Sequence, residues 1–113
     1  ASIARLERGL PATRLRLAPA MVGFGRALLD AGRAAEARPV LERGLELSLQ
    51  QFGETDWRTA EARLALGMCR QALGDAMPAA ELIRASRRAL QPYRTAQPGL
   101  TRQADSAAAA LAR

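Results

Sequence analysis

The chain has 113 residues, a formal net charge of +6 and only 4% aromatic residues, and alanine, leucine, arginine and glutamate dominate it. This composition favours helix and leaves little material for strands, so we expect one all-α domain. Because the chain contains no histidine and no lysine, it lacks the usual catalytic nucleophile pairs, Schiff-base lysines and phosphate-loop lysines, and we expect neither enzyme activity nor a cofactor.

The first predicted helix runs from about residue 19 to residue 31, because Pro19 suits a helix start and Gly32 suits a left-handed helix end. A second helix is expected from about residue 35 to residue 50, where apolar residues recur with helical spacing. Gly25 and Gly44 lie inside these two helices. Since glycine costs a helix about 1 kcal/mol relative to alanine, both positions require a reason.

A third helix is predicted from about residue 57 to residue 73, with Thr55 or Asp56 as its N-cap. It contains Cys69, the only cysteine of the chain. A single cysteine excludes an intramolecular disulfide and indicates a reducing, cytoplasmic location, and without histidine the usual zinc sites are excluded. Beside Met68 in helical sequence, the cysteine is expected to pack rather than to react.

A fourth helix is predicted from about residue 76 to residue 91 and ends at the stretch QPYRTAQPG. All 17 basic residues of the chain are arginines, and most alternate with acidic residues, as is typical of solvated helix faces. Only Arg84, Arg87 and Arg88 form a local cluster, and a nucleic-acid-binding surface would use these three residues together with Arg94. An arginine-rich nucleic-acid-binding module therefore remains the alternative function, although nucleic acid is not the partner we favour.

A final helix is predicted from about residue 100 to residue 112, after Pro98 and Gly99. No apolar stretch of the chain approaches the roughly 20 residues that span a bilayer, so we expect no membrane segment. The N-terminal segment ASIARLERGL also lacks the pattern of a signal peptide.

The chain repeats itself with a period of 42 residues. This shift pairs Phe24 with Leu66, Gly25 with Gly67, Gly32 with Gly74, Ala37 with Ala79, Leu41 with Ile83 and Gly44 with Ser86. We expect Gly25 and Gly44 to allow close helix approach, Phe24 and Leu41 to fill the neighbouring space, and Gly32 to end its helix. The expected single domain covers residues 1–113 and comprises the end of a preceding repeat (1–10), two repeats (19–50 and 57–91) and a terminal capping helix (100–112).

This phased pattern of small and bulky positions resembles the tetratricopeptide repeat. The period of 42 and the segments GRAAEARPVL and FGETDWRTAEARLALG are similar to the kinesin-light-chain type of that family, as it occurs in bacteria. The resemblance implies a right-handed α-solenoid of stacked antiparallel helical hairpins, with about two and a half repeats plus a terminal capping helix. It also places the chain as a fragment of a longer protein, such as the regulatory tail of a bacterial serine/threonine kinase.

The resemblance further implies a non-catalytic scaffold that binds a peptide or protein segment on its concave face. Carried over residue by residue, the partner-binding positions are Val22, Arg26, Leu29, Asp30, Glu61, Leu64, Met68 and Gln71, with Gln103 from the third copy. Specificity is expected where the copies differ, as at Arg26 against Met68. Two alternatives stay open: the same residues merely face solvent, or the chain self-associates weakly through an uncapped end that exposes Ile3 and Leu6.

Overall fold

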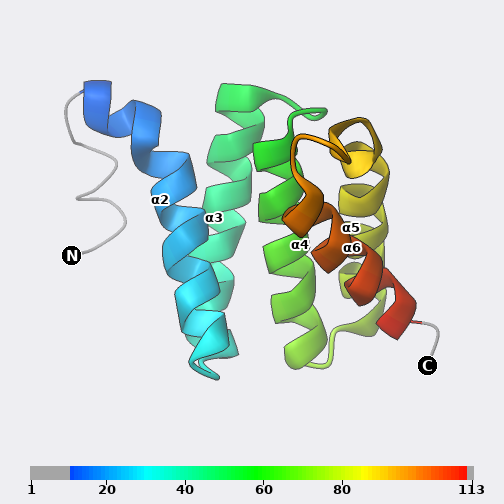
Figure 1. Cartoon of the computed structure of the whole chain (residues 1–113). Coiled ribbons are helices and arrows are strands. Elements are labelled where there is room, and N and C mark those ends of the chain that lie inside the picture. The colour runs from blue at the N-terminus through cyan, green and yellow to red at the C-terminus, as the bar shows by residue number, and fades with distance from the viewer. Residues whose placement is uncertain (1–10, 112–113) are drawn as a thin grey trace.

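The computed structural model describes the backbone of residues 11–111 and the side chains of residues 16–111, and this part contains helices but no strand (Figure 1). The elements are α2 (Pro11–Asp30), α3 (Ala34–Phe52), α4 (Trp57–Ala72), α5 (Ala76–Leu90), the short 3-10 helix η1 (Gln91–Tyr93) and α6 (Pro98–Ala110). The expected all-α class is therefore confirmed. The predicted repeat end at residues 1–10, with Ile3 and Leu6, and residue 112 of the predicted last helix lie outside the described residues.

Four of the predicted helices agree with the structure within two residues at each end, but the first prediction was wrong at its start. Helix α2 begins at Pro11, and Pro19 lies inside it. Leu17 and Met21, on either side of that proline, are buried in one apolar cluster with Val40 of α3. Burial against a neighbouring helix thus keeps the chain helical through a residue that, judged locally, favours a helix start.

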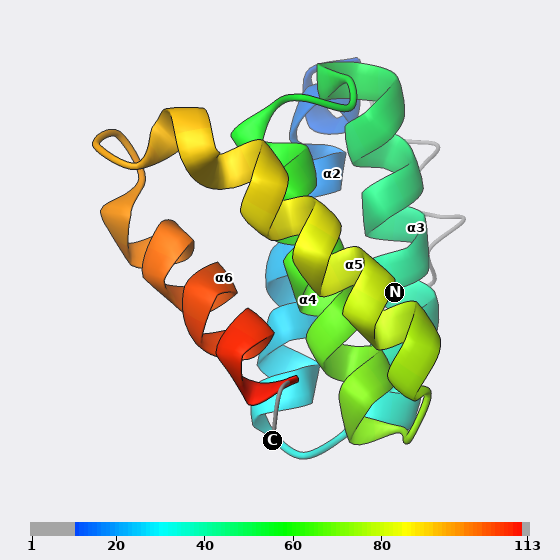
Figure 2. The same ribbon diagram turned by 90° about the vertical axis from the view of Figure 1, so that its right-hand side faces the viewer.

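The helices pack mainly on their neighbours in the chain. Helix α2 packs on α3 and α4 packs on α5, while contacts of α3 with α4 and of α2 with α4 join the two pairs. Helix α6 packs against α5 and touches α4 (Figure 2). One apolar cluster lies between α2, α3 and α4, and a second lies between α4, α5 and α6. The side of the molecule formed by α2, α4 and α6 is therefore built from the first helix of each 42-residue copy.

Gly25 and Gly67 mark a position of close helix approach within each pair. A Cβ atom built on Gly25 would lie 2.4 Å from Cδ2 of Leu41, and one built on Gly67 would lie 2.8 Å from Cγ1 of Ile83. Because Leu41 and Ile83 are also 42 residues apart, the same contact occurs in both pairs. At Gly44 a Cβ atom would lie 3.1 Å from a methyl group of Val22. The prediction that these small residues allow close packing is confirmed.

Gly32 and Gly74 have a different role from the glycines inside the helices. Their φ angles of 78° and 86° fall in the left-handed region, which suits the turns that end α2 and α4. The prediction that Phe24 fills interior space was wrong, since 57% of this residue is exposed. Its side chain lies on the part of α2 that no described helix covers.

The turn between α3 and α4 is held by Asp56, which is the N-cap of α4. Its carboxylate accepts a hydrogen bond of 2.8 Å from the backbone N–H of Arg58 and two more, of 2.9 and 3.0 Å, from the Arg58 guanidinium. The guanidinium bonds, supported by the backbone bond, lower the pKa of Asp56, although partial burial opposes the shift. The hydroxyl of Tyr93 donates to the carbonyl of Thr55 at 3.4 Å and ties η1 to this turn.

Candidate functional site

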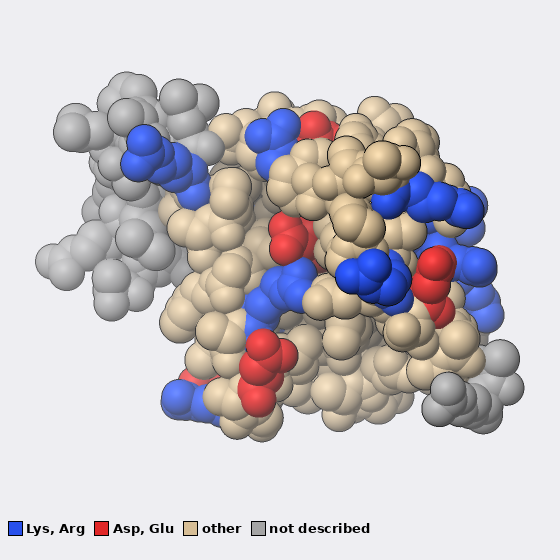
Figure 3. Space-filling model, in the orientation of Figure 1, with Lys and Arg blue, Asp and Glu red and all other residues tan. Residues whose placement is uncertain are grey.

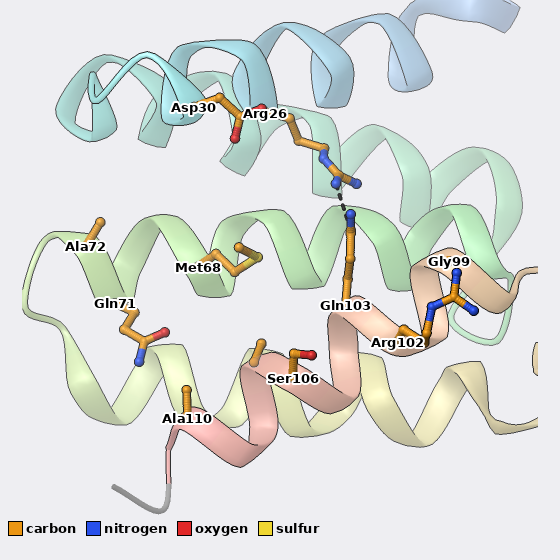
Figure 4. Close-up of a pocket in the computed structure, with 11 residues that line it drawn as sticks. Arg26, Asp30, Met68, Gln71, Ala72, Gly99, Arg102, Gln103, Ser106 and Ala110 are labelled. Carbon is orange, nitrogen blue, oxygen red and sulfur yellow. Dashed lines mark hydrogen bonds between the residues drawn. The ribbon is translucent and has the colours of Figure 1, made fainter.

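A pocket of about 860 Å³ lies where α2, α4 and α6 converge (Figure 4). This volume is within the range of pockets that hold small ligands or peptide side chains. Arg26 and Asp30 of α2, together with Met68 and Gln71 of α4, form two of its sides. Residues of α6 form the third side, and they include Arg102, Gln103, Ser106, Ala107 and Ala110.

Equivalent positions of the three copies meet in this pocket. Arg26, Met68 and Ala110 are spaced by 42 residues in the sequence, and all three line the pocket. Asp30 and Ala72 form a second pair with the same spacing. Equivalent backbone positions of the copies therefore line the pocket, but the side chains at these positions differ from copy to copy.

Arg26 links the three helices that surround the pocket. Its Nη1 donates to Oε2 of Glu61 on α4 at 2.8 Å, and its Nη2 donates to Oε1 of Gln103 on α6 at 2.8 Å. The side chains of Arg26 and Glu61 are 30% and 31% exposed. The guanidinium is thus held in place, and its charge is balanced by Glu61.

The remaining surface of the pocket combines an apolar floor with two separated charges. Met68, 40% exposed, lies between the helices, and Ala107 and Ala110 continue the apolar surface along α6. Asp30 and Arg102 project from α2 and α6 on different sides of Met68 (Figure 4). Among the described residues, neither of these two charges has an ion-pair partner.

The structure places the predicted partner-binding residues in three different environments. Arg26, Asp30, Met68, Gln71 and Gln103 line the pocket. Glu61 does not line it but fixes Arg26, and Leu29 is half-buried against the first apolar cluster.

Val22 and Leu64 were predicted to contact a partner, and this prediction was wrong. Both are core residues, with 4% and 1% exposure. Val22 occupies the space that Gly44 leaves on α3, with a methyl group 3.1 Å from the position that a Cβ of that glycine would take. Leu64 packs with Ile83 of α5 and Ala104 of α6 in the second apolar cluster. Both side chains therefore belong to the interior and are closed to a partner.

Sequence reasoning missed most of what α6 contributes. A shift of 42 from Met68 leads to Ala110, so that residue could have been found. Arg102 gave no such signal, since the equivalent positions in the earlier copies are Ala60 and Ala18, both fully buried. An arginine becomes possible there because α6 has no second helix of its own among the described residues.

Cys69 has the properties of a packing residue. It is fully buried, its Sγ donates to the carbonyl of Ala34 at 3.2 Å, and burial raises the pKa of its thiol. A raised pKa lowers the fraction of thiolate, which is the reactive form. The expected packing role is therefore confirmed.

The arginine cluster of α5 is only partly neutralised. Arg87 pairs with Asp105 at 2.9 Å, and Arg94 donates to Gln91. Arg84 and Arg88 are exposed, and no carboxylate of the described residues pairs with them. Figure 3 shows basic side chains gathered along the right-hand edge of the molecule, with acidic atoms among them.

Within residues 11–111, no set of three acidic, cysteine or histidine side chains is arranged to hold a metal ion. None of the helices in this range has the length and apolar character needed to cross a bilayer. The pocket and the arginine cluster are two chemically distinct features of the described surface.

No family model, no curated protein and no solved structure matches this chain.

Proposed function

We propose that the chain is a non-catalytic protein-interaction module that binds a short peptide or protein segment in the pocket between α2, α4 and α6. One observation carries this proposal: Arg26, Met68 and Ala110, which are equivalent positions of three sequence copies, converge on one pocket of about 860 Å³. Repeat proteins commonly use surfaces of this kind, formed by equivalent positions of stacked units, for binding. The absence of histidine and lysine agrees with a binding role rather than a catalytic one.

We also propose that the architecture is of the tetratricopeptide type, a right-handed solenoid of about two and a half repeats with α6 as terminal cap. The recurrence of the Gly25–Leu41 contact as Gly67–Ile83 supports stacked, equivalent hairpins. Arg102, Asp105 and Ser106 are exposed on α6, and this polar surface supports the cap, because terminal units of repeat arrays need polar residues where no further unit covers them.

The chemistry of the pocket suits a partner segment with three features. An apolar side chain fits against Met68, whose flexible thioether adapts to different shapes. A basic group near Asp30 and an acidic group near Arg102 would meet the two charges that have no ion-pair partner among the described residues. Because Arg26 is already neutralised by Glu61, we assign it the role of shaping one wall of the pocket.

Selection of random displayed peptides on the full chain tests this proposal. The affinities of selected peptides for the parent chain and for the Met68→Asp variant would be measured by calorimetry. Met68→Asp should weaken binding, because an apolar side chain of the peptide would have to displace water from a buried carboxylate. Met77→Asp is the matched control, since Met77 is 78% exposed on α5 and lies outside the pocket. We expect at least a tenfold loss of affinity for Met68→Asp and no change for Met77→Asp. Failure to select any peptide, or equal affinities for the two variants, would refute the proposal.

The second candidate function is nucleic-acid binding, which the exposure of Arg84 and Arg88 favours. Binding through phosphates weakens steeply with salt, so the affinity for duplex and single-stranded DNA should be measured across a salt series. Arg84→Gln combined with Arg88→Gln should then abolish binding. Undetectable binding of the parent chain at low salt would exclude this function.

We propose a cytoplasmic location for the module, since Cys69 is a free thiol, as expected in a reducing compartment. A regulatory part of a larger bacterial signalling protein, such as a serine/threonine kinase, is the context we propose for it. The arginine-rich, lysine-free composition supports a GC-rich bacterial source.

A further inference from the structure

The outer side of α5 carries three charges that the rest of the described chain leaves unpaired. This α5 outer face consists of Glu81, Arg84 and Arg88, which are spaced by three and four residues and are all exposed. Among the described residues, none forms an ion pair with any of the three. Residues at these spacings lie on one side of a helix, and like charges four residues apart repel each other. The two arginines therefore do not help the free chain to fold.

The internal repeat shows how the chain treats the same two positions in its first copy. A shift of 42 carries the two arginines to Glu42 and Glu46 of α3. Glu42 pairs with Arg70 of α4 at 2.9 Å, and Glu46 pairs with Arg43 at 2.8 Å. The first copy thus contains a counter-charge for each position. The second copy inverts both charges and, within the described chain, contains no counter-charge for either, and the missing groups are acidic.

Neither a further repeat nor a second copy of the chain explains this face. The side chains of Glu42 and Glu46 are 44% and 58% exposed, although α4 and α5 follow them in the chain. The face therefore stays open in a copy that is followed by another, so it is not where successive units stack. A second copy would bring a net charge of +6, and the glutamates it has at the matching spacing are already paired.

The distribution of charge also favours a protein over a phosphate polymer. Glu81 lies within one turn of Arg84, and Asp105 of α6 pairs with the neighbouring Arg87 at 2.9 Å. A row of phosphates, in nucleic acid or on a lipid surface, would meet these two carboxylates as well as the arginines. Nucleic-acid-binding proteins commonly contact about 6–10 phosphates, which is far more than two unpaired arginines provide. A protein segment can instead place acidic and basic groups at separate positions.

We propose that the α5 outer face binds a helix of a partner protein, which carries two acidic residues four positions apart and a basic residue three positions further on. In an antiparallel arrangement these residues lie opposite Arg88, Arg84 and Glu81. A helix suits this face because its residues three and four apart have the same separation as those of α5. The Glu42–Arg70 pair is an internal example of such an ion pair between two helices. Complementary charges of this kind select the partner and its orientation.

The test selects displayed single helices, randomised on one face, for binding to the full chain. The test variant combines Arg84→Glu with Arg88→Glu, and helices that also bind this variant are removed. It introduces the residues that α3 has at the equivalent positions, so α5 should still fold, which circular dichroism verifies. The matched control combines Arg16→Glu with Arg38→Glu. These two arginines are exposed and lie outside both the α5 outer face and the pocket, and the change in net charge is the same.

We expect the remaining helices to carry the acidic pair. Fluorescence anisotropy should give equal affinities for the parent chain and the control, and an affinity at least about tenfold lower for the test variant, because like charges then face each other. A selected helix whose two acidic residues are replaced by arginine should show the reverse preference. It should bind the test variant and not the parent chain.

Four results would overturn this proposal. No helix could remain after removal of those that bind the test variant, or the remaining helices could lack the acidic pair. The charge-reversed helix could fail to bind the test variant. Duplex DNA or anionic phospholipid vesicles could bind the parent chain and not the test variant, which would identify a phosphate surface as the occupant. The proposed pocket is tested separately, because helices bound there are lost in Met68→Asp and kept in the test variant.

Discussion

Gly23 and Gly25 lie two residues apart in α2, and the structure predicts opposite effects for their replacement by alanine. At Gly23 a Cβ atom would meet no heavy atom within 4 Å, so Gly23→Ala adds only helix propensity. This substitution should raise the free energy of unfolding by roughly 0.5–1 kcal/mol. At Gly25 a Cβ atom would lie 2.4 Å from Cδ2 and 2.5 Å from Cγ of Leu41.

The clash at Gly25 outweighs the gain in helix propensity. Leu41 is fully buried between α2, α3 and α4, so its side chain cannot turn away without disturbing the first apolar cluster. Overpacking of this kind costs about 1–3 kcal/mol, and the propensity term offsets about 1 kcal/mol. We expect Gly25→Ala to lower the free energy of unfolding by up to about 2 kcal/mol.

Urea denaturation followed by the fluorescence of Trp57 measures both variants against the parent chain. The two substitutions are chemically identical and share one helix, so their difference isolates the contact with Leu41. Gly67→Ala should lower stability in the same way, because its Cβ would lie 2.8 Å from Cγ1 of Ile83 and 3.3 Å from a backbone oxygen. If Gly25→Ala stabilised the chain as much as Gly23→Ala, the assignment of Gly25 as a close-approach position would be wrong.

Three further predictions concern the cap, the thiol and the charges of the pocket. Asp56→Ala removes the N-cap of α4 and should lower the free energy of unfolding by about 1 kcal/mol at pH 7. Because folding lowers the pKa of Asp56, its contribution is present above the unfolded pKa of about 3.9 and is lost as pH falls through the folded pKa, so the difference between the urea melts of parent and variant should shrink steadily as the pH is lowered below about 3.9. Cys69 should react with a thiol reagent only as fast as the chain opens, since it is fully buried with a raised pKa, and labelling that is fast in the native state would contradict its placement. Asp30→Arg combined with Arg102→Asp should select peptides whose basic and acidic residues occur in reversed order, and unchanged selection would show that these charges do not orient the ligand.

Much of the fold could be predicted because local signals and the repeat agree. Gly32 and Gly74 mark helix ends through a backbone conformation that only glycine adopts easily, and the structure has both in the left-handed region. The start of α2 could not be predicted, because the local preference of Pro19 is overridden by burial of Leu17 and Met21 against α3. That burial depends on Val40, which belongs to the next helix of the chain.

The candidate site was predicted in part for a related reason. Helical periodicity places Val22 and Leu64 near the pocket-lining residues, but it does not determine which side of a helix a neighbouring helix will cover. Leu64 is closed off by α5 and α6 together, and that arrangement follows from how α6 packs rather than from the pattern around Leu64. Arg102 is the converse case, since a position that holds a buried alanine in two copies becomes exposed in the third.

Arg26 differs from its equivalents in the other two copies, and this difference supports the proposed role of the pocket in recognition. The equivalent residues are Met68 and Ala110, so an arginine is not required for the helices to pack. Its ion pair with Glu61 is about one-third exposed, and pairs of this kind stabilise a fold by only about 0–1 kcal/mol. Yet its two hydrogen bonds join α2 to both α4 and α6 at the edge of the pocket. The bond to Gln103 of α6 is drawn in Figure 4. Because Arg26 adds little to stability but connects the three helices that form the pocket, recognition of a partner explains it better than folding does. The substitution Arg26→Met introduces the side chain that the second copy has at this position. It should therefore change peptide selection while leaving the free energy of unfolding within about 1 kcal/mol of the parent.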